Sequence, residues 1–301
     1  MKSLTMPTSL ASRSEFVSLR GLQVHCRHWG RDDAPLLFMV HGWMDVAASF
    51  QFVVDCLAQD WHVIAPDWRG FGLTQSPPVE SYWFPDYVAD LDAILQHFSP
   101  DQAVDLLGHS MGGNIAMIYA GVRPERISRL INLEGFGMPM SQAKQAPGRY
   151  RKWLDELREV PSLRTYANVD EVVARLQKTN PRLRDDRAHF LAQHWAQENA
   201  DGRWEILADP AHKNSSPLLY HVDEVLECWQ NIAAPVLWVE ANDTDIYRMI
   251  GEKEEARAEI DRRMKFVPKM QAEIVMDAGH MLHHDQPEIL AKLIEGFLAT
   301  N

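Results

Sequence analysis

The chain has 301 residues, of which 46% are hydrophobic and 24% are charged, and a formal net charge of -12. This length fits one large α/β domain with a smaller insertion, and the negative charge disfavours a nucleic-acid or anionic-membrane partner. No apolar run reaches the roughly 18 residues of a membrane span, so none is expected.

The N-terminal sequence and the cysteines favour a soluble, cytoplasmic protein. Residues 1–16, MKSLTMPTSLASRSEF, are polar and lack the apolar centre of a secretory signal. Cys26, Cys56 and Cys228 are far apart in the sequence and form no CxxC pair. Such spacing favours reduced thiols over a disulfide framework.

Short apolar runs alternate with helical patterns, which is typical of a mostly parallel sheet covered by helices on both faces. The pattern predicts strands at 36–40, 61–67, 103–108, 127–134, 235–243 and 272–280, and helices at 87–98, 111–120 and 288–299. The last helix carries Ile, Leu and Phe at helical spacing and is expected to pack on the sheet. The predicted fold class is therefore α/β.

Between residues 137 and 233 the strand pattern stops, and the sequence is charged and rich in tryptophan and helix formers. Such a segment is either a helical cap over the sheet or an inserted interaction module. A cap is favoured because the segment begins and ends at adjacent strand termini, where open α/β sheets bind ligands. The predicted division is a core of residues 1–136 and 234–301 with a cap of residues 137–233. Most aromatic residues of the cap are expected in its core, with some over the pocket: Trp153, Phe190, Trp195, Trp204 and Trp229.

A possible nucleophile lies in Gly108-His109-Ser110-Met111-Gly112, which fits the pattern G-x-S-x-G. The pattern follows a predicted strand and precedes a predicted helix, which is the context that a nucleophile elbow requires. The flanking glycines allow a sharp turn that projects the serine hydroxyl above the sheet. The alternative is a tight glycine turn with an incidental serine.

A serine nucleophile needs a base, and in this architecture the histidine comes late in the chain. His280 lies just past AEIVMD (272–277), the apolar part of the last predicted strand, in DAGHMLHH, with a glycine before it. His283 and His284 are nearby, and together with Asp277 these histidines could suggest a metal site. No cysteine or second acidic cluster accompanies them, so no metal is expected. His280 is the predicted base.

The acid that orients the histidine has several candidates. It must accept the other imidazole N–H and stabilise the imidazolium. Asp243, in EANDTD after the apolar run PVLWV (235–239), is the first choice, and Asp245 is two residues further on. Glu134, at the end of the strand before the cap, is the alternative acid from a different strand.

Two backbone N–H groups are expected to form an oxyanion hole. One belongs to Met111, directly after the serine and at a helix N-terminus. The other belongs to Trp43, after His41 and Gly42. His41 is expected to be a structural hydrogen-bonding group, and the Trp43 ring suggests an apolar or aromatic acyl group.

Six segments in order resemble the α/β-hydrolase superfamily: HGW (41–43), DWRGFG (67–72), GHSMGG (108–113), RPERI (123–127), ANDT (241–244) and GHMLHHDQPE (279–288). The resemblance covers the chain apart from the cap and is greatest to the serine hydrolase-like branch of carboxylic-ester hydrolases. It implies Ser110 as nucleophile, His280 as base, Asp243 as acid and the Trp43 and Met111 amides as the oxyanion hole. No cofactor is expected.

The chain is also similar to cofactor-free dioxygenases that act on hydroxyquinolones, in the tryptophan after the oxyanion glycine and in the PDWRG turn. These enzymes place their acid at the position of Glu134, as some haloalkane dehalogenases do, although the latter need an aspartate nucleophile. The predicted function is hydrolysis of a small to medium, apolar or aromatic carboxylic ester through an acyl-enzyme on Ser110. The alternatives are cofactor-free oxygenation or carbon–carbon bond hydrolysis of an aromatic substrate, and a non-catalytic binding module. The expected partner is a small-molecule substrate, and the sequence leaves the oligomeric state open.

Overall fold

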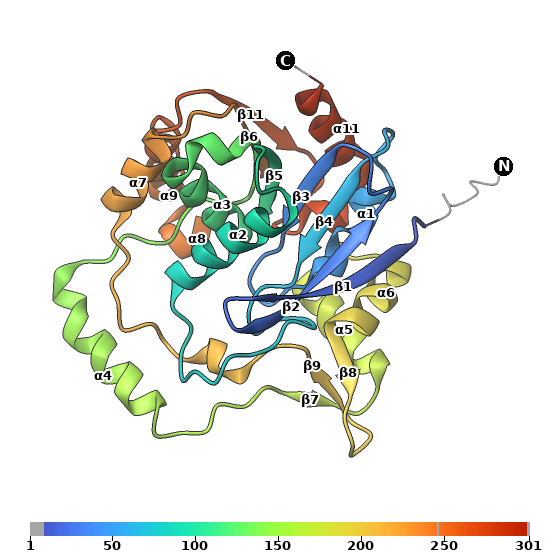
Figure 1. Ribbon diagram of the computed structural model, residues 1–301. Helices are drawn as coiled ribbons and strands as arrows, with labels where there is room; N and C mark the ends of the chain where they lie inside the picture. Colours follow the sequence, from blue (N-terminus) through green and yellow to red (C-terminus); the bar gives the residue numbers. More distant parts are fainter. Residues whose placement is uncertain (1–8, 246, 300–301) are drawn as a thin grey trace.

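Eight strands form the central sheet of the computed structural model, which describes residues 9–245 and 247–299 (Figure 1). The strand order is β1-β2-β4-β3-β5-β6-β10-β11. Neighbouring strands pair in parallel along β4-β3-β5-β6-β10-β11. β1 and β2 form an antiparallel hairpin at one edge, and β2 pairs antiparallel with β4. The bounds are β1 Ser12–Leu19, β2 Leu22–Trp29, β3 Leu36–Val40, β4 His62–Pro66, β5 Val104–His109, β6 Ile127–Leu133, β10 Val236–Ala241 and β11 Met270–Val275.

The predicted parallel strands are confirmed, whereas the sequence pattern missed the edge hairpin of β1 and β2. β3 is a continuous apolar run, LLFMV, because both of its faces are covered, and β5 is interrupted only by Asp105 before Gly108-His109. β1 begins with four polar residues, SRSE, and only one of its eight residues is buried, so at the edge of the sheet it carries no strand pattern. The polar residues 1–8 lie outside the described residues.

Helices cover both faces of the sheet. One face packs against α2 (Phe84–Phe98), α3 (Met111–Val122), α7 (Val222–Gln230) and α9 (Lys253–Met264). The other face packs against α1 (Gln51–Val54), α10 (Leu282–Asp285) and α11 (Pro287–Leu298). The helix α8 (Tyr247–Ile250) follows β10. The three predicted helices are thus confirmed as α2, α3 and α11.

The segment between β6 and β10 is not strand-free as expected. It contains a small sheet, ordered β7-β9-β8, besides helices. Its elements before α7 are α4 (Ala146–Glu156), β7 (Thr165–Tyr166), α5 (Val169–Thr179), α6 (Asp185–Trp195), β8 (Ala196–Glu198) and β9 (Trp204–Ile206). In Figure 1 the helix α4 stands away from the body, and none of its residues is buried.

Two of the predicted cap tryptophans lie in different cores, and Trp153 on the exposed helix α4 lies in neither. Trp195 lies in a hydrophobic cluster with residues of α5 and α6, which packs on Val46 and Ala48 of the main domain. Trp229 on α7 is instead buried in the main core against Trp238 of β10, because α7 packs directly on α3. The end of the predicted cap therefore lies against the main sheet layer.

The topology brings several chain segments to one edge of the sheet. Because β5, β6, β10 and β11 are parallel neighbours, their carboxyl ends lie side by side. Ser110 follows β5, Glu134 follows β6, Asp243 follows β10 and His280 follows β11. Open α/β sheets bind ligands at this edge.

Candidate active site

Ser110 lies at a strained turn between β5 and α3. Its φ of 53° and ψ of -114° are unusual for a residue other than glycine. The turn is tight: a Cβ on Gly108 would lie 2.5 Å from the carbonyl oxygen of Gly112, and one on Gly112 would lie 2.2 Å from that of Val40. Both positions therefore require glycine, and the turn projects the serine from the end of the strand as an elbow.

His280 connects Ser110 to Glu134. Its Nε2 lies 2.9 Å from Ser110 Oγ, and its Nδ1 lies 3.1 Å from Glu134 Oε2. A carboxylate accepts hydrogen bonds, so the Nδ1–H of His280 donates to Glu134 and Nε2 accepts from the serine hydroxyl. The three side chains form one continuous row with the geometry of a serine, base and acid.

Glu134 is almost fully buried, with 1% of its surface exposed, and it sits at a strained φ of 57°. Its Oε1 accepts the backbone N–H of Ala241 at 2.7 Å, and its Oε2 accepts the hydroxyl of Thr244 as well as the His280 N–H. Burial raises the pKa of the Glu134 carboxyl, while the bonds from His280, Thr244 and Ala241 oppose that rise. The residue is thus held in place by Ala241 at the end of β10, by Thr244 in the loop that follows, and by His280.

Asp243, the first choice for the acid, points elsewhere. Its Oδ2 accepts from Arg182 at 2.6 Å, and its side chain is 47% exposed. Arg182 lies between β6 and β10, in the segment predicted as a cap and called the capping segment below. Asp245 is exposed. The expectation that Asp243 contacts His280 is not met, because the site between β6 and β10 is filled by Glu134, and the loop after β10 supplies donors to that carboxylate.

The loop after β3 carries the other expected oxyanion donor. A Cβ on Gly42 would lie 3.2 Å from Ser110 Cβ, so this loop lies against the elbow. Within the described ranges, the backbone N–H groups of Trp43 and Met111 have no backbone acceptor. The Nε1–H of Trp195 donates to the carbonyl of Met44 at 2.7 Å, which ties the capping segment to this loop. The Trp43 side chain is 55% exposed.

His41 has the structural role expected of it. The residue is fully buried, its Nε2 accepts the backbone N–H of Trp68 at 3.0 Å, and its Nδ1 lies 2.7 Å from the Gly42 carbonyl. The Trp68 indole in turn donates to the His41 carbonyl at 2.9 Å. These bonds use both ring nitrogens and fix the start of the loop after β3. Because this loop carries Trp43, the expected oxyanion donor, it is called the oxyanion loop below.

A buried histidine cluster lies behind His280. Asp45, His109 and His283 could each offer a ligand atom, and these atoms lie within 4.8 Å of one another. A zinc ion with ligands at about 2.0–2.1 Å would need them closer, within roughly 3.4 Å. Asp45 already accepts hydrogen bonds from Ser49 and from the Val46 N–H. This donor set therefore fits a hydrogen-bonded cluster better than a metal site.

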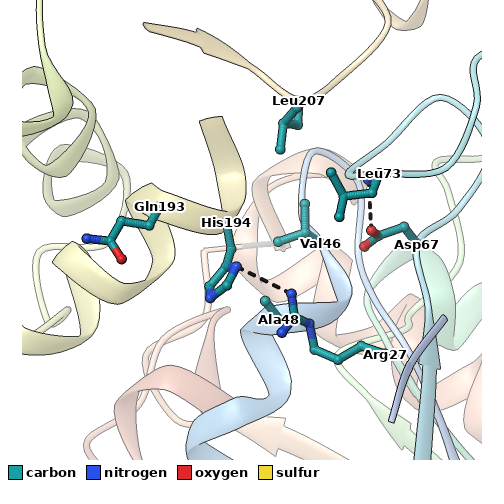
Figure 2. Close-up of a pocket in the computed structure, with 8 residues that line it drawn as sticks. All are labelled: Arg27, Val46, Ala48, Asp67, Leu73, Gln193, His194 and Leu207. Atoms are coloured by element: carbon teal, nitrogen blue, oxygen red, sulfur yellow. Dashed lines mark hydrogen bonds between the residues drawn. The ribbon is translucent and has the colours of Figure 1, made fainter. Parts of the chain in front are cut away.

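A separate cavity of about 70 Å³ lies between the main domain and the capping segment (Figure 2). Figure 2 shows Arg27 of β2 meeting His194 of α6 across it, with 3.3 Å between Arg27 Nη2 and His194 Nδ1. Its lining residues are Arg27, Val46, Ala48, Asp67, Leu73, Gln193, His194 and Leu207. Because none of them is Ser110, His280 or Glu134, this cavity is not where those three residues meet.

Comparison with known proteins shows the family of the chain. A model of the family described as alpha/beta hydrolase fold matches residues 35–287. The chain belongs to the alpha/beta hydrolase family. The predicted resemblance and fold class are thereby confirmed.

Several relatives of this alpha/beta hydrolase align over most of its length. It is 25% identical over 278 residues to a serine hydrolase-like protein of Danio rerio, covering 90% of this chain and 83% of the relative. It is 26% identical to the human serine hydrolase-like protein 2, covering 91% and 90% of the two chains. A solved structure described as the thioesterase domain from the curacin biosynthetic pathway is 27% identical, with a TM-score of 0.82 and coverage of 95% and 99%.

In this alpha/beta hydrolase no described helix has the length and apolar character to cross a membrane. The three cysteines are all free. Sequence reasoning found Ser110 and His280, which the structure brings together, and named Glu134 only as the alternative acid. It missed Thr244 and Ala241, whose contacts to Glu134 depend on the loop after β10 and leave no recognisable sequence signal.

Proposed function

We propose that this alpha/beta hydrolase cleaves a carboxylic ester or thioester through an acyl-enzyme on Ser110, with His280 as base and Glu134 as acid. One observation carries the proposal: the unbroken hydrogen-bonded row from Ser110 Oγ through His280 to Glu134. The strained elbow and the serine hydrolase-like and thioesterase relatives support it.

Acylation begins when Ser110 Oγ attacks the carbonyl carbon and its proton passes to His280 Nε2. The imidazolium that forms is stabilised by the Glu134 carboxylate at Nδ1. The N–H groups of Met111 and Trp43 hold the oxyanion, and the electrostatic contribution of such donors is large. The carbonyl carbon then loses its alcohol or thiol, which receives the proton from His280.

Deacylation repeats these steps with water. The water oxygen attacks the acyl carbon while His280 Nε2 takes a proton from the water. The proton then passes from His280 to Ser110 Oγ as the acyl–serine bond breaks. The free acid leaves, and the enzyme returns to its starting state. A small to medium acyl group that is apolar or aromatic is favoured because the exposed Trp43 ring belongs to the same loop as the oxyanion donor.

The decisive experiment is Ser110→Ala assayed with p-nitrophenyl esters and acyl thioesters. We expect a loss of about 10⁴-fold or more in kcat, by analogy with other serine hydrolases. Turnover that survives the substitution would refute the acyl-enzyme. Labelling of the native protein by a fluorophosphonate tests the same serine independently, and a non-catalytic binding module would not be labelled.

A second candidate is cofactor-free oxygenation of an aromatic substrate, because Glu134 occupies the strand position that those dioxygenases use for their acid. Hydrolysis is favoured over it because the free nitrogen of His280 faces the Ser110 hydroxyl, so the base is placed to take the serine proton. Oxygen uptake with a hydroxyquinolone, together with activity retained by Ser110→Ala, would favour the oxygenase. Carbon–carbon bond hydrolysis would appear as cleavage of a diketone.

A further inference from the structure

His109, the residue before Ser110, contacts the loop that carries His280. This loop, residues 276–281 between β11 and α10, is called the base loop below. His109 ends β5, and its Nε2 lies 2.8 Å from the backbone carbonyl oxygen of His280. The two imidazole rings lie 4.9 Å apart between centroids. The main chain of the base is therefore held by the side chain adjacent to Ser110, while the side chain of the base contacts Ser110 and Glu134.

The tautomer of His109 follows from its surroundings. The residue is 1% exposed, and burial lowers its pKa well below the usual value for histidine, so the ring is neutral. A carbonyl oxygen can only accept, so Nε2 carries the proton and donates to His280. Nδ1 is then unprotonated and has no hydrogen-bond partner within the described part of the chain.

A second histidine supports the ring of His109. His283 on α10 is fully buried, and its ring centroid lies 4.3 Å from that of His109. His283 Nε2 lies 3.7 Å from Asp45 Oδ2, and Asp45 is itself fixed by the Ser49 hydroxyl at 2.8 Å. His109 is therefore packed between the oxyanion loop, the elbow and the base loop, with little freedom to turn.

We propose that His109 is a positioning residue, whose Nε2–H bond to the His280 carbonyl fixes the distance between the base and the nucleophile. This inference rests on the proposed function, because it assigns His280 the role of base. A small displacement suffices to matter: a misplacement of about 1 Å can cost roughly 10²-fold in rate. His109 itself touches neither Ser110 Oγ nor the imidazole nitrogens of His280 in the hydrogen-bond network.

The test compares His109→Leu, His109→Gln and His284→Leu, with kcat expressed per site titrated by fluorophosphonate. Leucine removes the donor, and glutamine restores an amide N–H at a similar reach. His284 is the matched control, since it is also a buried histidine, lies on α10 four residues after His280, and makes no hydrogen bond to His280 within the described residues. If His109→Leu does not fold, His109→Asn, whose amide is shorter, takes its place.

For His109→Leu we expect kcat to fall about 10- to 100-fold with KM changed less than about 3-fold, from the geometric cost of misplacement. His109→Gln should return to within about 5-fold of the native rate, and His284→Leu should keep it. In the proton NMR spectrum, the low-field signal of the His280–Glu134 hydrogen bond should broaden or shift in His109→Leu alone.

Equal losses in His109→Leu and His284→Leu, or no recovery in His109→Gln, would overturn the positioning role and indicate general packing. A native rate in His109→Leu would overturn it as well. The NMR signal needs no substrate. Failure of this inference is therefore distinguishable from failure of the proposed function, which Ser110→Ala reports.

Discussion

Replacing Glu134 by glutamine should reverse the tautomer of His280. The carboxylate accepts from three donors: the Ala241 N–H, the Thr244 hydroxyl and the His280 Nδ1–H. In Glu134→Gln the carbonyl oxygen stays with Ala241, because the backbone N–H cannot move, and the new NH₂ group faces His280. An NH₂ group cannot accept, so Nδ1 must give up its proton and Nε2 must carry it. A protonated Nε2 cannot take the proton of Ser110.

The expected loss in kcat is about 10³- to 10⁴-fold, the size seen when the acid of another serine hydrolase is made an amide. Each tenfold loss corresponds to about 1.4 kcal/mol, so the substitution raises the barrier by about 4–5.5 kcal/mol. Asp243→Asn is the matched control. It removes only the half-exposed ion pair with Arg182, and such pairs contribute about 0–1 kcal/mol to stability. Its kcat should stay within about twofold of the native value, since no contact to His280 is lost.

The assay is kcat per titrated site on a p-nitrophenyl ester, with circular dichroism and thermal unfolding to verify that each variant is folded. The rate of fluorophosphonate labelling should fall in parallel, because labelling uses the same base. A native rate in Glu134→Gln beside a large loss in Asp243→Asn would refute the assignment. Equal mild losses would show that neither carboxylate supports His280.

Three further predictions concern the support of the site and of the fold. Thr244→Val removes the hydroxyl that donates to Glu134, and a hydrogen bond to a charged group contributes about 1.5–3 kcal/mol, so kcat per titrated site should fall roughly tenfold or more. Gly112→Ala places a Cβ 2.2 Å from the Val40 carbonyl oxygen, and urea unfolding should show a loss of about 3 kcal/mol or no soluble protein. His212 has a pKa lowered to about 4 by burial, and it stacks against aromatic rings. The unfolded chain binds its proton first, so stability falls as the pH drops from about 6.5 to 4, and His212→Gln should reduce the loss between pH 7 and 4.5 by about 2–3 kcal/mol.

Each of these predictions has a contrary outcome. A native kcat in Thr244→Val would mean that the other two donors suffice to hold Glu134. A stable Gly112→Ala would mean that the elbow relaxes away from β3. An unchanged pH dependence in His212→Gln would mean that the ring titrates alike in the folded and unfolded chains. Thr244→Ser, which keeps the hydroxyl, is the control for the first variant.

The positions of Ser110 and His280 were predictable because each lies in a local pattern. Ser110 needs glycines at fixed offsets in a strand-to-helix turn, and His280 follows a strand with a glycine before it. The acid was not predictable, since both Glu134 and Asp243 follow strands whose carboxyl ends lie side by side. The choice between them depends on side-chain direction, and the strained φ of 57° at Glu134 is a conformation that the sequence pattern does not reveal.

The register of two neighbouring strands gives the physical reason for that choice. Val239 of β10 pairs with Leu133 of β6, and the Glu134 N–H donates to the Val239 carbonyl at 3.0 Å. This pairing keeps the main chain of Glu134 in the sheet, so the positive φ turns its side chain toward the loop after β10. There the N–H of Ala241, the last residue of β10, and the hydroxyl of Thr244 in the following loop donate to its carboxylate.

The loop after β10 thus supports Glu134 through Thr244, and its carboxylate Asp243 contacts the capping segment instead of His280. Asp243 pairs with Arg182, and a Cβ on Gly279, next to the base, would lie 3.3 Å from the Arg182 guanidinium. The capping segment is therefore anchored beside His280 through Asp243, and beside the oxyanion loop through Trp195 and Met44. Two separate contacts of one segment reach the two sides of Ser110.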